Sequence, residues 1–371
     1  MCFTTCRTDC GSNGSYDVAG SVSVEIKEPL TPKGEFIYLV NYKITIFYSY
    51  SPLGVRGSSM ENNTQQHWAI IINPKSGKKR FRQQSKYLFL TLKNAGIEYE
   101  YRVTKFAGHA IKIARLFAEK KYQNFMVLGG DGTLSEVING IFSANIEVTN
   151  SLKIALIPRG TGNDWGRFWG LTRDYKLSLA VFLKGNLQFI DIGKVDFELE
   201  GEEQTHFFIN SLGLGLDATV VNITHTLKRY VDSHSFLYTI ALFLAVFTYR
   251  ANKIKIRSTD RNMDENMFTM NVANGCYSGG GLKQTPNALP NDGLLDVMMA
   301  KKPTFIDIIG ALHLFFKGKL HEHPIIESFQ TQSLMIQCHK HALMEADGIV
   351  VNGTSPYTIS IIPNAIQMIV P

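Results

Sequence analysis

Three glycines and one aspartate interrupt an apolar stretch in the middle of the chain. Within residues 125–142, a strand-like run ends at Gly129, Gly130, Asp131 and Gly132, and apolar side chains then recur at helical spacing. Glycine lets the backbone approach an anion, and the N–H groups that open a helix carry the positive end of its dipole. This junction of strand and helix therefore predicts a phosphate site.

Asp131 stands inside this loop, where its charge would repel a bare phosphate. A carboxylate there makes chemical sense when a divalent cation, or a hydroxyl group that must be oriented, lies between it and the phosphate. The stretch therefore predicts nucleotide phosphoryl transfer. A plain strand-to-helix turn is the alternative, because glycine-rich loops after strands are common.

The surrounding elements alternate between strands and helices. Residues 68–72 and 152–157 are continuous apolar runs, typical of strands buried on both faces of a parallel sheet, and residues 98–104 form a further strand. Helices are predicted over about 80–95 and 108–120. The alternation predicts a doubly wound α/β sheet, whose ligands bind at the carboxyl ends of the strands.

Four polar turns fall at those carboxyl ends, and the last of them spans residues 158–165. Asn163 or Asp164 alone is explained as the cap of the next helix. Both lie at the same sheet edge as the glycine loop, which favours a site. The turn that begins at Asn73 lacks the leading glycine of a Walker A loop.

After about residue 188 the hydrophobic pattern changes to period 2, which predicts an antiparallel β-rich domain, either sandwich or barrel. The predicted strands are 189–197, 206–211, 252–258, 266–274, 294–300, 333–338, 341–345, 349–351 and 356–362. The resulting domain boundaries are 60–188 for an α/β nucleotide-binding domain, 189–354 for the β-rich domain, and 355–371 for a segment that could return to the first domain.

Residues 1–59 do not resemble the rest of the chain. Our hypothesis is that this leader is disordered, or that translation of the natural protein starts at Met60.

Two helices interrupt the β-rich half. Residues 236–249 carry no charge and are too short to span a bilayer, so a buried core helix is expected, with a lipid pocket or membrane contact as the alternative. The second helix runs from Pro303 to about Phe316, with the proline in the first turn.

The composition is that of an ordinary folded protein, with 371 residues, 44% hydrophobic residues and a formal net charge of +6. The basic residues are too few, and too little interleaved with aromatic residues, for a nucleic-acid groove, so no nucleic acid is expected as a partner. Five cysteines without zinc spacing or a disulfide framework indicate a reducing, cytoplasmic compartment.

The ordered set of motifs from Trp68 onward resembles the diacylglycerol kinase-like catalytic family, which includes bacterial lipid kinases and sphingosine kinases. The motifs are Asn73-Pro74-Lys75-Ser76-Gly77, Thr104 with Gly108-His109-Ala110, Gly129-Gly130-Asp131-Gly132-Thr133, the 158–164 turn, Asn210 with Gly213, Gly215 and Asp217, Gly279-Gly280-Gly281, and 290–296. The resemblance implies an ATP-binding α/β domain, a β-rich domain, and an acceptor lipid in the cleft between them. By this resemblance the residues that would hold ATP are Asn73, Thr104, Gly129, Gly130, Asp131, Gly132, Thr133, Leu134, Ser135 and Thr161, with Asp131 serving the phosphoryl-transfer centre.

The resemblance also implies a structural Mg²⁺ site. Its ligands would be the carbonyl oxygens of Leu289 and Leu294 and the carboxylate of Asp292, with Asp296 nearby. All-oxygen ligation suits this hard cation. A plain β-turn with Asp and Gly in their favoured places is the alternative.

One position departs from the family pattern. The family carries Asp-Gly-Glu near the C-terminus, with carboxylates assigned to deprotonating the acceptor hydroxyl, whereas this chain has Asp347, Gly348 and Ile349. Either Asp347 serves as the base, helped by Glu345, or the protein binds nucleotide and lipid without efficient turnover.

The sequence therefore predicts an ATP- and Mg²⁺-dependent kinase that phosphorylates a hydroxyl of diacylglycerol or a related lipid, with peripheral contact at the inner face of the membrane. A catalytically weak nucleotide- or lipid-binding regulator is the first alternative. An NAD kinase, which shares the Gly-Gly-Asp-Gly-Thr motif, is the second, although that family's Asn-Glu pair is not evident here. The oligomeric state is left open, a dimer included.

Overall fold

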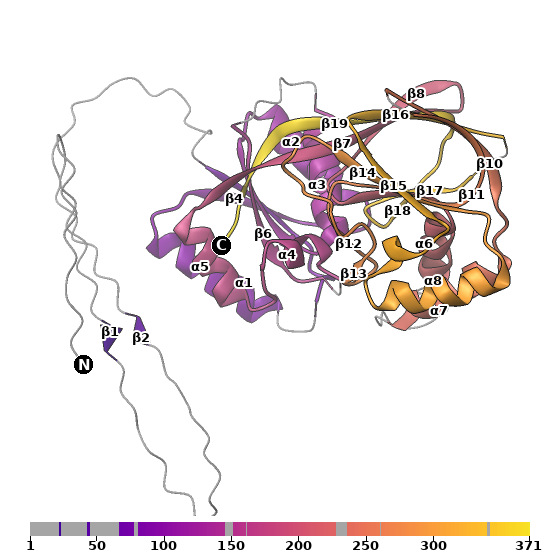
Figure 1. The fold of residues 1–371 in the computed structure, drawn as a ribbon. Helices are drawn as coiled ribbons and strands as arrows, with labels where there is room; N and C mark the ends of the chain where they lie inside the picture. Colours follow the sequence, from indigo (N-terminus) through magenta and orange to yellow (C-terminus); the bar gives the residue numbers. More distant parts are fainter. Residues whose placement is uncertain are drawn as a thin grey trace, which may run out of the picture. The chain divides into compact units, whose positions relative to one another are not determined.

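The computed structural model describes residues 22–23, 43–44, 67–77, 81–144, 151–160, 162–227, 236–259, 261–339 and 342–371 (Figure 1). Thr161, Met60 and the remainder of residues 1–59 lie outside these ranges, so the predictions made for them stay predictions. Within the leader only β1 (Val22–Ser23) and β2 (Lys43–Ile44) are described, and they pair antiparallel with each other.

The first domain is built on a parallel sheet in the order β6-β5-β3-β4. Its elements are β3 (Trp68–Ile72), α1 (Phe81–Asn94), β4 (Tyr99–Val103), α2 (His109–Glu119), β5 (Asn124–Gly129), α3 (Asp131–Phe142), β6 (Lys153–Pro158), α4 (Asp164–Phe168) and α5 (Tyr175–Lys184). Alternate strand residues enter two different cores. Ile71 and Val127 pack with α2 and α3, whereas Ile70 and Met126 pack with α1 and α5. Helices therefore cover both faces, and the predicted doubly wound sheet is confirmed.

The second domain is mainly antiparallel, as predicted. Its strands are β7 (Leu187–Leu199), β8 (Glu202–Phe208), β9 (Ser211–Gly215), β10 (Asn252–Ser258), β11 (Asn262–Ala273), β12 (Tyr277–Ser278), β13 (Leu282–Lys283), β14 (Leu295–Lys301), β15 (Ile326–Thr331), β16 (Ser333–Cys338), β17 (Met344–Ala346), β18 (Ile349–Val351) and β19 (Thr354–Ile369). Its helical segments are α6 (Leu216–Leu227), α7 (Phe236–Thr248), α8 (Phe305–Phe316) and the short 3-10 helix η1 (Leu320–Glu322).

Several details of this half differ from the sequence prediction. Residues 206–211 are not one strand, because β8 ends at Phe208 and β9 begins at Ser211. The helix α6 and the strand β15 were not predicted at all. Pro303 precedes α8 instead of lying in its first turn, because Thr304 is the N-cap and forms a capping box with Asp307.

The C-terminal strand β19 joins the two domains (Figure 1). It pairs antiparallel with β7 and β16, and its last residues, Gln367 and Met368, pair parallel with β6 of the first domain. Residues 355–371 thus begin in the β-rich domain and end beside the parallel sheet. One continuous sheet therefore sets the relative position of the two domains.

Helices α6, α7 and α8 gather at one end of the second domain (Figure 1) and pack on Phe268 of β11 and Met298 of β14. The sequence predicts α7 as buried core, which is correct for one face only. Leu237, Ala241 and Ala245 are buried, whereas the opposite face is exposed. Among the described helices, none has the length and apolar character that crossing a bilayer requires.

Replacing Ile366 by alanine should test the role of β19 as the joint between the domains. Ile366 is fully buried in the core of the first domain and lies opposite Ile190 of β7. We expect the free energy of unfolding to fall by about 2–5 kcal/mol, because the variant leaves a cavity. Urea denaturation measures this value. Leu187→Ala, at a 43% exposed position of β7, is the control and should change stability by only about 0.5 kcal/mol; similar losses in the two variants would contradict the prediction.

Candidate active site

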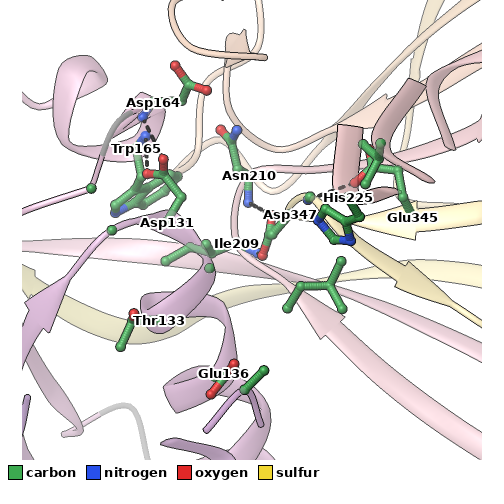
Figure 2. Close-up of a pocket in the computed structure, with 18 of the residues that line it drawn as sticks. Asp131, Thr133, Glu136, Asp164, Trp165, Ile209, Asn210, His225, Glu345 and Asp347 are labelled. Carbon is green, nitrogen blue, oxygen red and sulfur yellow. Dashed lines mark hydrogen bonds between the residues drawn. The ribbon is translucent and has the colours of Figure 1, made fainter. Parts of the chain in front are cut away.

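A cavity of about 870 Å³ lies between the strand-end loops of the first domain and the loops and helix α6 of the second. Figure 2 shows Asp131 and Thr133 on the side of the first domain, and Asp347 and Glu345 on the side of the second. The predicted gathering of polar turns at one sheet edge is therefore present. Each domain contributes chemically distinct groups to the same space.

The glycine loop and its neighbours form a compact floor. The side-chain amide of Asn73, directly after β3, donates to Thr133 Oγ1 on α3 at 2.9 Å. A Cβ atom added to Gly130 would lie only 2.7 Å from the Cα of Gly160 in the loop after β6. Glycine is thus needed here so that the two loops can touch, and the residues that open α3 line the cavity.

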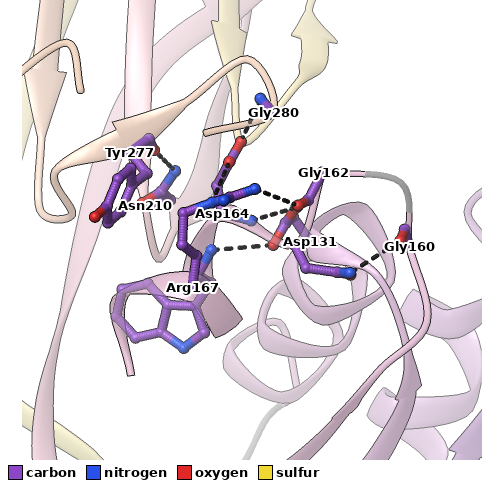
Figure 3. Close-up of polar contacts among 10 residues, drawn as sticks. Asp131, Gly160, Gly162, Asp164, Arg167, Asn210, Tyr277 and Gly280 are labelled. Atoms are coloured by element: carbon purple, nitrogen blue, oxygen red, sulfur yellow. Dashed lines mark hydrogen bonds and ion pairs between the residues drawn. The ribbon is translucent and has the colours of Figure 1, made fainter. Parts of the chain in front are cut away.

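Asp131 fastens these two loops together (Figure 3). Its carboxylate accepts hydrogen bonds from the backbone N–H groups of Asp164 at 3.0 Å and Trp165 at 3.2 Å, which open α4. Asp164 in turn accepts from the N–H of Gly280 in the second domain at 2.8 Å. Burial raises the pKa of Asp131, and burial together with repulsion from Asp131 raises that of Asp164 to about 6.

Glu136 plays the same part for a neighbouring helix, and sequence reasoning missed it. Its two carboxylate oxygens accept from the N–H groups of Gly108 at 2.8 Å and Ala110 at 3.1 Å, at the start of α2. The sequence feature that could have identified Glu136 is its position on α3, because this helix lies between two predicted loops at one edge of the sheet.

The second domain presents Asp347 to the cavity. Its carboxylate accepts from three successive backbone N–H groups, those of Ile209, Asn210 and Ser211, at 2.9–3.1 Å. Burial raises its pKa to about 6, and these three donors oppose that rise because they favour the ionised form. Asp347 is therefore a held carboxylate that is ionised at neutral pH.

Glu345 is the second carboxyl group of this segment. It is buried, accepts from the N–H of Gly348 at 2.7 Å, and lies near Asp217 and Asp347. Burial, followed by repulsion from these two carboxylates, raises its pKa well above the ordinary value. Ile349 also lines the cavity but offers no acceptor, so the carboxyl groups that this segment contributes are Asp347 and Glu345.

The predicted ATP-binding residues divide into two groups. Those that line the cavity are Asn73, Thr104, Gly130, Asp131, Gly132 and Thr133. Gly129 closes β5, and Leu134 is buried in the core of the first domain. Ser135 is also fully buried, but its side chain contacts the carboxylate of Asp347 in the second domain.

The predicted magnesium residues Leu289, Asp292 and Leu294 do not line this cavity. Asp292 accepts from the N–H of Leu294 at 3.0 Å within its own turn. The buried carboxylate of Asp191, which sequence reasoning missed, holds the same turn by accepting from the N–H groups of Gly293 and Asn364, each at 2.7 Å. Within the described part of the chain, no three His, Cys, Asp or Glu side chains gather as a metal cluster.

A second, narrow cavity of about 70 Å³ adjoins the first. Asp217, Tyr238 and Gln284 line both cavities. The remainder of its wall is almost entirely apolar and comes from α7, α8 and the strands beneath them. A polar cavity thus continues into an apolar one.

Family models match both halves of the chain. A model described as the diacylglycerol kinase catalytic domain matches residues 67–195, and one described as the YegS C-terminal NAD kinase beta sandwich-like domain matches residues 210–370. The chain belongs to the diacylglycerol kinase-like family. It is therefore a member of a kinase family, which implies the use of ATP.

Relatives in this family cover most of the chain. The diacylglycerol kinase of Staphylococcus saprophyticus is 28% identical over 281 residues, which are 75% of this chain and 87% of that protein. The diacylglycerol kinase of Staphylococcus aureus strain MRSA252 is 28% identical over 282 residues, with 75% and 84% coverage. A diacylglycerol kinase structure from Bacillus anthracis str. Sterne shares the fold, with a TM-score of 0.60, 21% identity, and coverage of 82% of this chain and 97% of that one.

The role of Asp131 as a fastener can be tested through the helix that it holds. In Asp131→Ala the N–H groups of Asp164 and Trp165 lose their acceptor, so we expect the opening free energy of the α4 segment to fall by about 1–3 kcal/mol. Amide hydrogen exchange at residues 164–168 measures this change. The control Glu119→Ala removes only an exposed ion pair with Arg115 and should leave α4 unchanged. Unaltered α4 protection in Asp131→Ala would refute the assignment.

Proposed function

We propose that this protein transfers the γ-phosphate of ATP to a hydroxyl group of diacylglycerol or a related lipid. The observation that carries the proposal is the pairing, across one cavity, of a glycine-lined helix start with the amide-held carboxylate of Asp347. The first suits a chain of phosphates, and the second suits a hydroxyl that must lose its proton.

The phosphates would lie on the side of the first domain. There the opening N–H groups of α3, the hydroxyl of Thr133, and the exposed side chains of Lys75 and Lys105 all border the cavity. These groups are donors or cations, which phosphate oxygens require. Asp131 holds the loops that shape this wall.

The acceptor would enter from the narrow apolar cavity. Its hydroxyl end would meet Asp217, Tyr238 and Gln284, which border both spaces, while its acyl part would follow the apolar wall. In the reaction the hydroxyl oxygen forms a bond to the γ-phosphorus, and the bond from that phosphorus to the bridging oxygen of ADP breaks. Asp347 takes the hydroxyl proton.

The acidic wall explains why Mg²⁺ is part of the proposal. Carboxyl groups that border the cavity are Asp131, Glu136, Asp164, Asp217, Glu345 and Asp347. When bound, Mg²⁺ supplies positive charge that reconciles nucleotide phosphates with these acids. For the structural site implied by the family, the residues that would hold Mg²⁺ are Asp292 through its carboxylate and Leu289 and Leu294 through their carbonyl oxygens, and oxygen ligands suit a hard cation.

The test of catalysis is an assay with radiolabelled ATP and a panel of lipids, in the presence of Mg²⁺ or of EDTA. We expect phosphorylation of a glycerolipid hydroxyl only with Mg²⁺, and a fall of about 100- to 10,000-fold in Asp347→Asn, since the positioned base is lost. Asp196→Asn, at an exposed ion pair with Lys194, is the matched control and should retain full activity.

Two results would replace this proposal. ATP binding without transfer to any lipid would favour the nucleotide-binding regulator, for which Ile349 in place of the family's glutamate is the specific argument. Formation of NADP from NAD and ATP would favour an NAD kinase.

The pKa of Asp347 predicts the pH profile of the lipid kinase reaction. Burial raises this pKa from the ordinary value of 3.8 to about 6, so the ionised base grows as pH rises through 6. We expect kcat/KM to rise about tenfold per pH unit below that point and to level off above about pH 7. A profile measured with the wild type and Asp347→Asn decides the assignment. The residual activity of the variant should not rise with pH in this range. If the rise persists in the variant, the titration belongs to another group.

A further inference from the structure

The outer face of α7 is an apolar stripe that no described part of the chain covers. Ile240, Phe243, Leu244 and Phe247 recur at positions i, i+3, i+4 and i+7 and are between 42% and 54% exposed. The opposite side of the same helix packs into the second domain. When a helix is apolar on both sides, its exposed apolar side indicates a surface that contacts another molecule.

Helix α8 continues this surface. Phe305, Ile306, Ile309 and Phe316 share one side of the helix and are between 48% and 80% exposed. The rings of Phe247 and Phe305 lie 6.4 Å apart, so the two stripes meet. These four residues and the four of α7 form one surface, called here the α7–α8 face.

Basic side chains border the α7–α8 face. Arg250 follows α7, Lys302 precedes α8 and Lys317 follows α8, and all three are exposed. None of them forms an ion pair with another residue of the described ranges. Neither stripe contains an acidic residue, since α7 has no charge and the one acid of α8, Asp307, is bound in its capping box. The border is therefore complementary to a negatively charged surface.

The narrow cavity lies directly beneath this face. It is lined by Leu242 and Val246 from the inner side of α7 and by Ile308, Leu312 and Phe315 from α8. Its other end meets the large cavity. An occupant of the α7–α8 face would thus lie next to an apolar route toward the site.

We infer that the α7–α8 face docks on a lipid bilayer with anionic headgroups, the apolar side chains entering the interface and the bordering cations meeting the headgroups. This inference rests on the proposed function, because it identifies the surface from which a lipid acceptor would be drawn. A second copy of the chain is the disfavoured occupant, since a twofold contact would bring the same cations together. The mode is interfacial, as neither helix spans a bilayer.

The test measures sedimentation of the full chain with vesicles of phosphatidylcholine, with or without phosphatidylglycerol, in the absence of ATP and acceptor. We expect binding to the anionic vesicles, weakened at least tenfold in Phe305→Ser/Ile306→Ser. The control Leu177→Ser/Leu183→Ser alters similarly exposed residues of α5 and should bind like the wild type. Lys302→Gln/Lys317→Gln should bind more weakly and depend less on salt.

The inference is overturned if the wild type ignores anionic vesicles, or if the α8 variant and the α5 control lose binding equally. It is also overturned if sedimentation equilibrium shows a dimer that the α8 variant dissociates. Activity on a monomeric short-chain diacylglycerol separates this inference from the proposed function. The α8 variant should keep that activity and lose activity on acceptor embedded in vesicles. If vesicle binding follows the expected order and no lipid is phosphorylated, the docking surface stands and the proposed function fails.

Discussion

Carboxylates that accept hydrogen bonds from backbone N–H groups hold the cavity in shape. Asp131 fixes the start of α4, Glu136 fixes the start of α2, and Asp347 fixes residues 209–211. A buried charge is costly unless hydrogen-bond donors surround it. The ionised form of each of these acids is therefore stabilised only while the loop that supplies its donors stays in place. The loops of both domains are therefore positioned by the acids that also give the cavity its charge.

Burial also acts on the acids of the second-domain wall. It raises the pKa of Asp217 to about 6 and that of Glu345 well above its ordinary value, so it favours the neutral form of both. The first domain offers helix N–H groups and lysines. The first-domain wall also carries Asp131, Glu136 and Asp164, so both walls are acidic, and Lys75 and Lys105 are what favours the first wall for the proposed phosphates. Strand β19 carries one sheet through both domains and so links the two walls by strand pairing.

Much of the architecture could be predicted from local pattern. Continuous apolar runs at 68–72 and 152–157 indicated buried parallel strands, and the change to period 2 after residue 188 indicated the β-rich domain. The failures have local causes. A two-residue break separates β8 from β9, and the favourable capping box at Thr304 moved the start of α8 past Pro303. The uncharged α7 could not reveal that only one of its faces is buried, because every position is apolar or neutral.

Residue type and short spacing were enough to predict the strand-loop-helix unit at Gly129–Asp131–Gly132 and the polar turns at one sheet edge, whereas Asp347 became a candidate base only through the resemblance to the family. The role of each carboxylate emerged from the folded chain instead. Asp131 accepts a hydrogen bond from Asp164 of α4, which is 33 residues away in the sequence, and Asp347 accepts one from Ile209, which is 138 residues away. Asp191 joins Gly293 and Asn364 in the same way. Such contacts arise when the sheet closes and brings distant loops together, so no periodicity or motif along the chain encodes them.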